Sequence, residues 1–163
     1  MLPSRMMKPK VYVETTVVSY LTARPNRDIV VAAHQQITRE WWDTRREYFQ
    51  LVASQLVLQE ASAGDSEAAR ERLEVLTAVT LLEVTPEALA LAQELVGVGA
   101  VPPQAAEDAL HIAIAVTNGV EYLLTWNHRH LANATMRTKI EDVCRSAGFE
   151  PAIICTPEEL LEG

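Results

Sequence analysis

Short apolar runs alternate along this chain with longer segments of helical periodicity, and this alternation limits the fold more than any other feature. The runs occupy residues 10 to 14, 50 to 53, 80 to 84, 121 to 126 and 152 to 155. Strands separated by helices form parallel sheets, because each crossover returns the chain to the same end of the sheet. We therefore expect an α/β protein with a central, mainly parallel sheet of about five strands.

The intervening segments predict helices. Two of them place apolar residues on one helical stripe, which should pack inward. The stripes are Val30, Ala33, Ile37, Trp41 and Tyr48 in residues 28 to 48, and Ala69, Leu73 and Leu76 in residues 66 to 78. Thr85-Pro86 and Gly97 are typical of the two ends of a third helix, and Pro103 and Gly119 of a fourth.

The length of 163 residues predicts one domain, residues 9 to 163, preceded by a disordered extension of residues 1 to 8. No apolar stretch approaches the roughly 20 residues that span a bilayer, so we expect no membrane contact. Cys144 and Cys155 are isolated thiols without CxxC spacing, which favours a reducing, cytoplasmic location.

The charge is unevenly distributed. The net charge is −8, but the first 50 residues hold eight Lys or Arg against five Asp or Glu, and the remainder holds six against 17. This balance argues against broad, non-specific coating of DNA, and it permits nucleic-acid binding by one basic face.

Four polar residues stand where apolar sequence would otherwise continue. Glu14 and Asn127 each close an apolar run, while Glu60 and Asp108 interrupt apolar helical sequence. Ligand sites in open α/β sheets lie at the carboxyl ends of the strands, so these side chains are expected to face one cleft. Three converging carboxylates repel one another unless cations neutralise them, and Mg²⁺ or Mn²⁺ prefers such oxygen ligands.

In this order, Glu14, Glu60, Asp108 and the segment Thr125-Trp126-Asn127 resemble the acidic constellation of PIN-domain ribonucleases. The resemblance is closest to the VapC-like toxins of bacterial toxin–antitoxin pairs, and it covers roughly residues 9 to 156. It implies a three-layer α/β/α sandwich that hydrolyses RNA phosphodiester bonds with Mg²⁺ or Mn²⁺. It also implies an antitoxin partner and a homodimer.

Carried over by position, the resemblance implies that Glu14, Glu60 and Asp108 are the metal ligands and that Asn127 is a fourth catalytic position. Thr15, Thr16 and Thr125 would support them. Glu14 replaces a more usual Asp, and Asn127 replaces a more usual acid. The second change leaves a one-metal or a two-metal mechanism open, and it gives an alternative: a catalytically weakened PIN-fold module that binds RNA or protein.

Each acid also has an ordinary structural interpretation. Glu14 fits the favourable end of a helix dipole, Glu60 fits a solvent-facing helix position, and Asp108 fits a surface ion pair. His111, one helical turn after Asp108, fits either a core-edge histidine or a group that orients a carboxylate or contacts phosphate.

Further residues have the chemistry of RNA or partner contact. They are Arg39, Trp41, Trp42, Arg45 and Arg46 in one predicted helix, and His128 and His130 in a predicted loop. Arginines beside aromatic rings suit phosphate contact and base stacking, although a partner groove and a dimer surface are open as well. Adjacent helical residues point about 100° apart, so we expect only one of the two tryptophans to enter the core.

Overall fold

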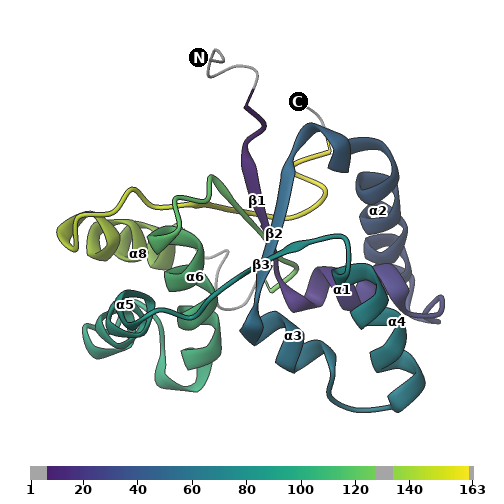
Figure 1. Cartoon of the computed structure of the whole chain (residues 1–163), viewed down its shortest axis with the longest axis horizontal. Coiled ribbons are helices and arrows are strands. Elements are labelled where there is room, and N and C mark those ends of the chain that lie inside the picture. The colour runs from purple at the N-terminus through teal and green to yellow at the C-terminus, as the bar shows by residue number, and fades with distance from the viewer. Residues whose placement is uncertain (1–6, 128–133, 162–163) are drawn as a thin grey trace.

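The structure is a computed structural model, and it describes residues 7 to 127 and 134 to 161. Its five strands form one parallel sheet in the order β3-β2-β1-β4-β5 (Figure 1). The strands are β1 (Lys10–Val13), β2 (Gln50–Ser54), β3 (Thr80–Leu82), β4 (Tyr122–Leu124) and β5 (Ile153–Cys155). The predicted α/β fold and its five-stranded parallel sheet are confirmed.

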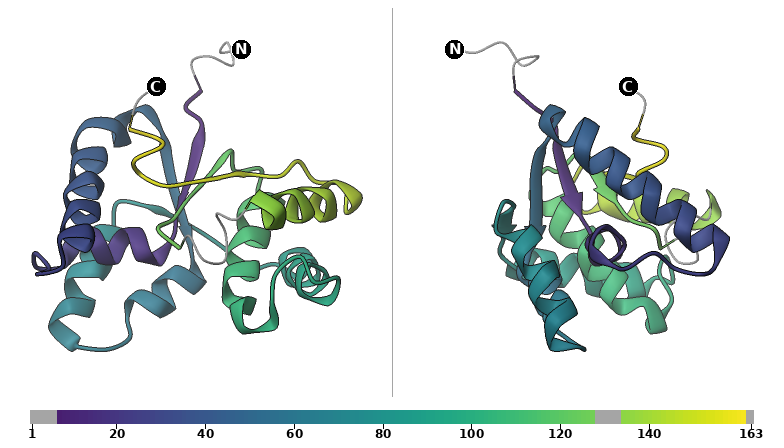
Figure 2. Two further views of the ribbon diagram at one scale, coloured as in Figure 1. Left: turned by 180° about the vertical axis from the view of Figure 1, so that it is seen from behind. Right: turned by 90° about the vertical axis from the view of Figure 1, so that its right-hand side faces the viewer.

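Helices cover both faces of the sheet. They are α1 (Thr15–Thr22), α2 (Ile29–Arg45), η2 (Arg46–Tyr48), α3 (Gln55–Ala61), α4 (Ser66–Leu76), α5 (Pro86–Gly97), η3 (Pro103–Ala105), α6 (Ala106–Thr117) and α8 (Ala134–Ser146). Helices α1 to α4 lie on one face, and α5, α6 and α8 lie on the other (Figures 1 and 2). This arrangement is the expected three-layer sandwich.

The local sequence accounts for the element boundaries. Val11 and Val13 are β-branched and fully buried in the central strand, which pairs with β2 on one side and β4 on the other. The Thr85 hydroxyl accepts a hydrogen bond from the Ala88 N–H at 3.2 Å and caps α5. Gly119, with φ of 68°, ends α6 in a conformation that glycine adopts at little cost. The predicted ends of α5 and the predicted stop of α6 are confirmed, whereas the predicted start at Pro103 is the short 3-10 helix η3, and α6 itself begins at Ala106.

The two predicted stripes have different outcomes. Ala69 and Leu76 of α4 are buried as expected. Of the stripe predicted in residues 28 to 48, Trp41 is fully buried and Ile37 packs against the core, as expected, but Val30 and Tyr48 are 63% and 60% exposed. The polar residues Gln35 and Thr38 of α2 are buried instead. Gln35 hydrogen-bonds the backbone of the preceding loop, at 3.0 Å for each of its two polar atoms. Side-chain hydrogen bonds therefore contribute, together with apolar burial, to the choice of the inward face of α2.

Candidate functional site

The sheet places three polar positions at one edge. Glu14 follows β1, Ser54 ends β2 and Thr125 follows β4, and β1 lies between the other two strands. The Glu14 N–H donates to the carbonyl of Leu124 at 3.1 Å, so the pairing with β4 continues to the end of the strand. The connections that leave the neighbouring strands β1 and β4 run in opposite directions, to β2 and to β5, and this is the usual position of a ligand site in such sheets.

Glu14 is a buried carboxylate with several donors. It is 4% exposed and serves as the N-cap of α1, where it accepts from the Thr16 N–H at 3.1 Å. The Thr16 hydroxyl donates to it at 2.5 Å, and the Thr125 hydroxyl at 2.6 Å. These donors offset the cost of burying the charge. Glu14 therefore has the structural role of a helix cap and also a fixed orientation at the strand edge.

Glu60, on α3, is linked to a chain of buried polar groups. Its Oε1 lies 2.9 Å from His111 Nε2 and also accepts from the Thr15 hydroxyl. His111 Nδ1 lies 2.7 Å from the Tyr12 hydroxyl, which lies 2.7 Å from the Ser54 hydroxyl. The ring of His111 is 1% exposed. His111 is thus a buried histidine whose Nε2 hydrogen-bonds the Glu60 carboxylate.

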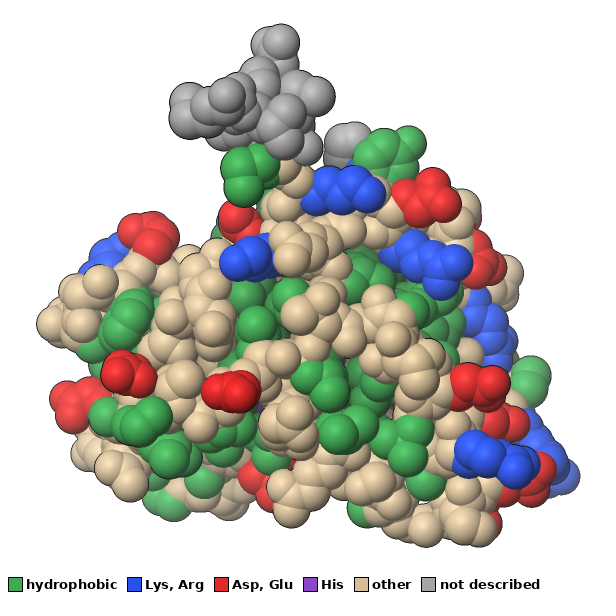
Figure 3. Space-filling model, in the orientation of Figure 1, with side chains coloured by type: hydrophobic (Ala, Val, Ile, Leu, Met, Phe, Trp, Pro, Cys, Tyr) green, Lys and Arg blue, Asp and Glu red, His purple; other side chains and the backbone are tan. Residues whose placement is uncertain are grey.

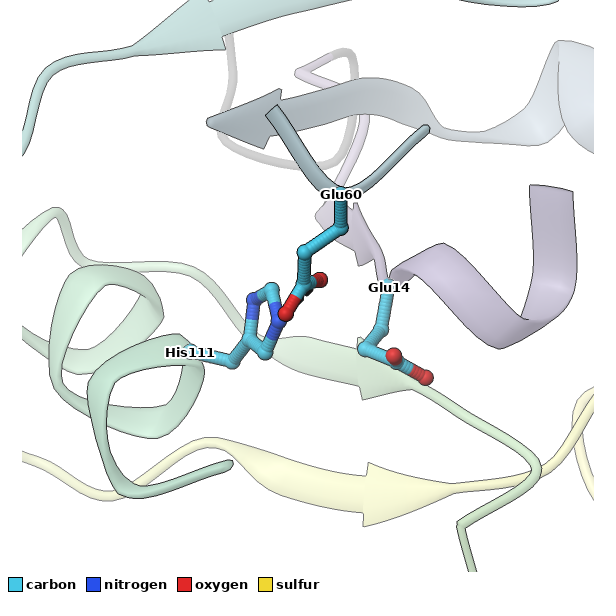
Figure 4. Close-up of side chains that lie close together, drawn as sticks. All are labelled: Glu14, Glu60 and His111. Atoms are coloured by element: carbon cyan, nitrogen blue, oxygen red, sulfur yellow. Dashed lines mark hydrogen bonds and ion pairs between the residues drawn. The ribbon is translucent and has the colours of Figure 1, made fainter. Parts of the chain in front are cut away.

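One group of potential metal ligands stands out among the described residues. Glu14, Glu60 and His111 each offer one ligand atom, and these atoms lie within 4.8 Å of one another. Figure 4 shows the Glu60 carboxylate next to the imidazole, with Glu14 on the adjoining strand end. The group contains two of the three predicted ligands. It includes His111 and does not include Asp108.

The electrostatics follow from these contacts. Burial alone would raise the pKa of Glu60, but the hydrogen bond and charge of His111, with the Thr15 hydroxyl, lower that pKa to about 2. Burial raises the pKa of Tyr12 far above its usual range, so the phenol stays neutral. Glu60 is thus ionised at neutral pH, and the Tyr12 hydroxyl can donate or accept.

Glu107 is a site residue that the sequence reasoning missed. It lies in the first turn of α6, and its hydrogen bond to Glu60 and the negative charge of Glu60 raise its pKa. The signal was its position directly before Asp108, but acids in the first helical turn are common because they interact favourably with the helix dipole. Glu107 brings a further carboxyl group to Glu60.

Asp108 and Asn127 form a second cluster. The side-chain Nδ2 of Asn127 donates to both carboxylate oxygens of Asp108, at 3.0 and 2.9 Å. The Asn127 N–H also donates to the Thr125 hydroxyl at 3.0 Å, and that hydroxyl in turn donates to Glu14. The Asn127 side-chain amide is therefore a hydrogen-bond donor to Asp108 in this structure.

Comparisons with known proteins bear on the fold. No family model matches the sequence, and no curated protein matches it. The structure is similar to a chain of VapBC2 from Rickettsia felis bound to a DNA fragment from their promoter, with a TM-score of 0.59 and 14% identity. That match covers 90% of this chain and 98% of the other. A chain of VapBC-1 from nontypeable Haemophilus influenzae gives a TM-score of 0.57 and 14% identity, covering 91% and 98%.

The chain has a VapC-like PIN fold. These matches confirm the resemblance found in the sequence at the level of the fold, because structural similarity at 14% identity shows a shared fold. Within the described residues of this PIN fold, no helix has the length and apolar character needed to cross a membrane.

Trp126 fixes the segment after β4 of the PIN fold. Its indole ring stacks on His34 with centroids 4.1 Å apart and lies 6.1 Å from the ring of Tyr20. Its Nε1–H donates to the Thr38 hydroxyl at 2.7 Å, and its backbone N–H donates to the Thr16 hydroxyl at 3.0 Å. The sequence around Trp126 does not reveal this role, because its partners lie on the distant helices α1 and α2.

The two tryptophans of α2 do not form an exposed stacking surface. Trp41 is fully buried and packs on Phe49 at 5.8 Å, and Trp42 is 9% exposed beneath the guanidinium of Arg46, 5.0 Å from its ring. The expectation that only one of them enters the core is therefore wrong, because the buried face of α2 is broad enough for both.

The remaining predicted contact residues are distributed over the surface. Arg39 donates to the carbonyl of Ala23 at 2.7 Å, the guanidinium of Arg45 lies 4.5 Å from the Tyr48 ring, and Arg46 is exposed. Lys and Arg side chains gather mostly on the side of the molecule covered by α2 and α4 (Figure 3). His128 and His130 lie outside the described residues.

Proposed function

We propose that this chain is a divalent-metal-dependent endoribonuclease that hydrolyses RNA phosphodiester bonds, and that it is the toxin of a toxin–antitoxin pair. The observation that carries the proposal is the convergence of Glu14, Glu60 and His111 at the carboxyl end of the central strand. Asp108 is tied to the same edge through Asn127 and Thr125.

The donor set fits a divalent ion such as Mg²⁺ or Mn²⁺, because carboxylate oxygens are its preferred ligands and Mn²⁺ also accepts imidazole. Glu14 and Glu60 would hold it, with Asp108 as the third acid. A bound ion would lower the pKa of a coordinated water and offset negative charge on the phosphoryl oxygens.

The chain's own residues position these acids. Thr16 and Thr125 fix the carboxylate of Glu14, while Thr15 and His111 fix that of Glu60. Because the orienting hydroxyls come from α1 and from the segment after β4, the acids keep their geometry without substrate. Such preorganisation is the main way in which a protein stabilises developing charge.

Arg45 and Arg46 support binding of RNA on the α2 side of the molecule, since both are cations near the surface and phosphate contacts dominate nucleic-acid affinity.

The described Cys144 and Cys155 are free and buried, and burial raises their pKa values to about 11 and about 12. Unreactive, unpaired thiols support a cytoplasmic location.

Glu14→Gln is the direct test of the nuclease proposal. The amide keeps the size of the side chain but removes the charge, so Mn²⁺-dependent cleavage of RNA should fall by at least about a hundredfold. The measurement is cleavage of total RNA by purified protein, followed by sequencing of RNA ends after controlled expression. The matched control is Glu74→Gln, because Glu74 is an exposed residue of α4. This variant should cleave RNA at the wild-type rate. Equal rates for Glu14→Gln and the wild type would refute the proposal.

The alternative function is a catalytically weakened PIN module that binds RNA or protein, and the observation that favours it is the Asn127 amide engaged with both oxygens of Asp108. Calorimetry with Mn²⁺ separates the two functions. A nuclease should bind Mn²⁺, and Glu60→Gln should lower its affinity for the ion. A binding module need not bind Mn²⁺ at all.

The proposed partners are an antitoxin and a second copy of the chain. The tryptophans of α2 no longer support a dimer, because both are buried, but Ile29 and Val30 at the start of α2 are 84% and 63% exposed. We expect light scattering at micromolar concentration to give the mass of a dimer, and a small antitoxin to co-purify from the native host. A monomer at all concentrations, without a co-purifying partner, would contradict both expectations.

A further inference from the structure

The imidazole of His111 is the least expected member of the site, because PIN-type acids alone do not require it. Its Nε2 lies 2.9 Å from Glu60 Oε1 and belongs to the same 4.8 Å group as Glu14. We propose that His111 is a metal ligand through Nε2, and that this nitrogen makes the site select Mn²⁺ over Mg²⁺. The inference rests on the proposed function, and it goes beyond it by naming the ligand atom and the ion.

The distances suit direct ligation. In an octahedral site with bond lengths of about 2.1 Å, adjacent ligand atoms lie about 3.0 Å apart. The separation of 2.9 Å between His111 Nε2 and Glu60 Oε1 has this size. In the present hydrogen bond Nε2 points at Oε1, so one ion can contact both atoms once this bond is broken and the two side chains turn toward the ion.

Ligation needs an Nε2 without a proton, and the buried chain behind the ring can provide it. When Nε2–H donates to Glu60, Nδ1 accepts from the Tyr12 hydroxyl, which accepts from Ser54. In the other tautomer, Nδ1–H donates to the Tyr12 hydroxyl, which donates to Ser54. An uncharged imidazole carries one proton in either tautomer, so the two tautomers differ only in the position of that proton and in the orientation of two hydroxyl groups.

The nitrogen ligand decides the selectivity. Mg²⁺ is a hard ion that binds oxygen and keeps much of its water shell, whereas Mn²⁺ accepts imidazole more readily. The fixed Nδ1 contact with Tyr12 also orients the ring, as the second nitrogen of metal-bound histidine usually requires. A site built from Glu14 and Glu60 alone would lack this preference.

Pulsed electron paramagnetic resonance of Mn²⁺ bound to untagged protein tests the proposal, because it detects coupling to a coordinated ¹⁴N nucleus. The wild type should show this coupling. The chain has four histidines. A triple variant that carries His34→Gln, His128→Gln and His130→Gln keeps only His111, and it should retain the ¹⁴N coupling. His111→Gln should lose it, and the ratio of Mn²⁺ to Mg²⁺ affinity should fall by about tenfold or more.

Tyr12→Phe is a second probe, since it removes the hydroxyl behind the ring and keeps the ring's packing. It should retain the ¹⁴N coupling and weaken Mn²⁺ binding by about ten- to a hundredfold, the usual effect of losing an outer-shell partner. Mn²⁺ bound to the wild type without ¹⁴N coupling would overturn the proposal and leave the nuclease proposal with an all-oxygen site. Loss of the coupling in the triple variant would overturn it too. Failure of the wild type to bind Mn²⁺ would defeat the proposed function as well.

Discussion

Asp108→Ala should reduce Mn²⁺-dependent RNA cleavage by at least about a hundredfold, the size of loss that removal of one charged group from a reaction centre can cause. Asp108 is partly exposed in the first turn of α6, so its loss leaves no cavity in the core. It does leave the Asn127 amide without this acceptor, which should lower the free energy of unfolding by about 1.5–3 kcal/mol. The measurements are the cleavage rate and a urea denaturation curve.

Asp43→Ala is the matched control for that variant. Asp43 is an exposed aspartate of α2, and its replacement should change neither the rate nor the stability appreciably. A well-folded Asp108→Ala protein that cleaves RNA at the wild-type rate would remove Asp108 from the mechanism.

Asn127→Asp should destabilise the metal-free protein and strengthen its response to Mn²⁺. The wild-type amide donates to both oxygens of Asp108, and the new carboxylate would face those oxygens with a like charge. Repulsion at about 4 Å and an effective dielectric near 20 is on the order of 4 kcal/mol. A divalent ion bound between the two carboxylates attracts both of them, and this attraction outweighs their mutual repulsion.

Melting curves with a chelator and with Mn²⁺ measure the effect. The mutant should melt below the wild type in chelator and should gain more on addition of Mn²⁺. Asn26→Asp, in an exposed loop, controls for the added charge and should show the wild-type metal response. Equal metal-induced shifts in the wild type and Asn127→Asp would mean that Asn127 lies outside the metal site.

Features that depend on local sequence were predictable. The β-branched run that forms β1, the Thr85 cap of α5 and the glycine that ends α6 all act within a few residues. The position of Glu14 at the edge of the central strand followed as well, because parallel strands bring their carboxyl ends together. These features are set by chain geometry.

Features that depend on a distant partner were not predictable. The inward face of α2 is selected partly by the hydrogen bond between Thr38 and Trp126, 88 residues apart. His111 joins Glu60 through a contact across 51 residues, and it is held by Tyr12 across 99. Periodicity reports how apolar a helix face is, but it does not report which buried polar group will find a partner. The metal roles of Glu14, Glu60 and Asp108 remain predictions.

The topology of the sheet also governs when the site can form. Glu14 receives the hydroxyl of Thr125 from 111 residues further along the chain, and β1 cannot complete its pairing before β4 exists. At a synthesis rate of about 5–20 residues per second, roughly 6 to 22 s separate the appearance of these two residues. A growing chain therefore carries its first acid for most of its synthesis without the hydroxyl that orients it. Contacts so far apart in sequence also slow folding, since each must close a long loop. The Glu14 carboxylate can therefore take its final orientation only after the fourth strand of the sheet has been synthesised.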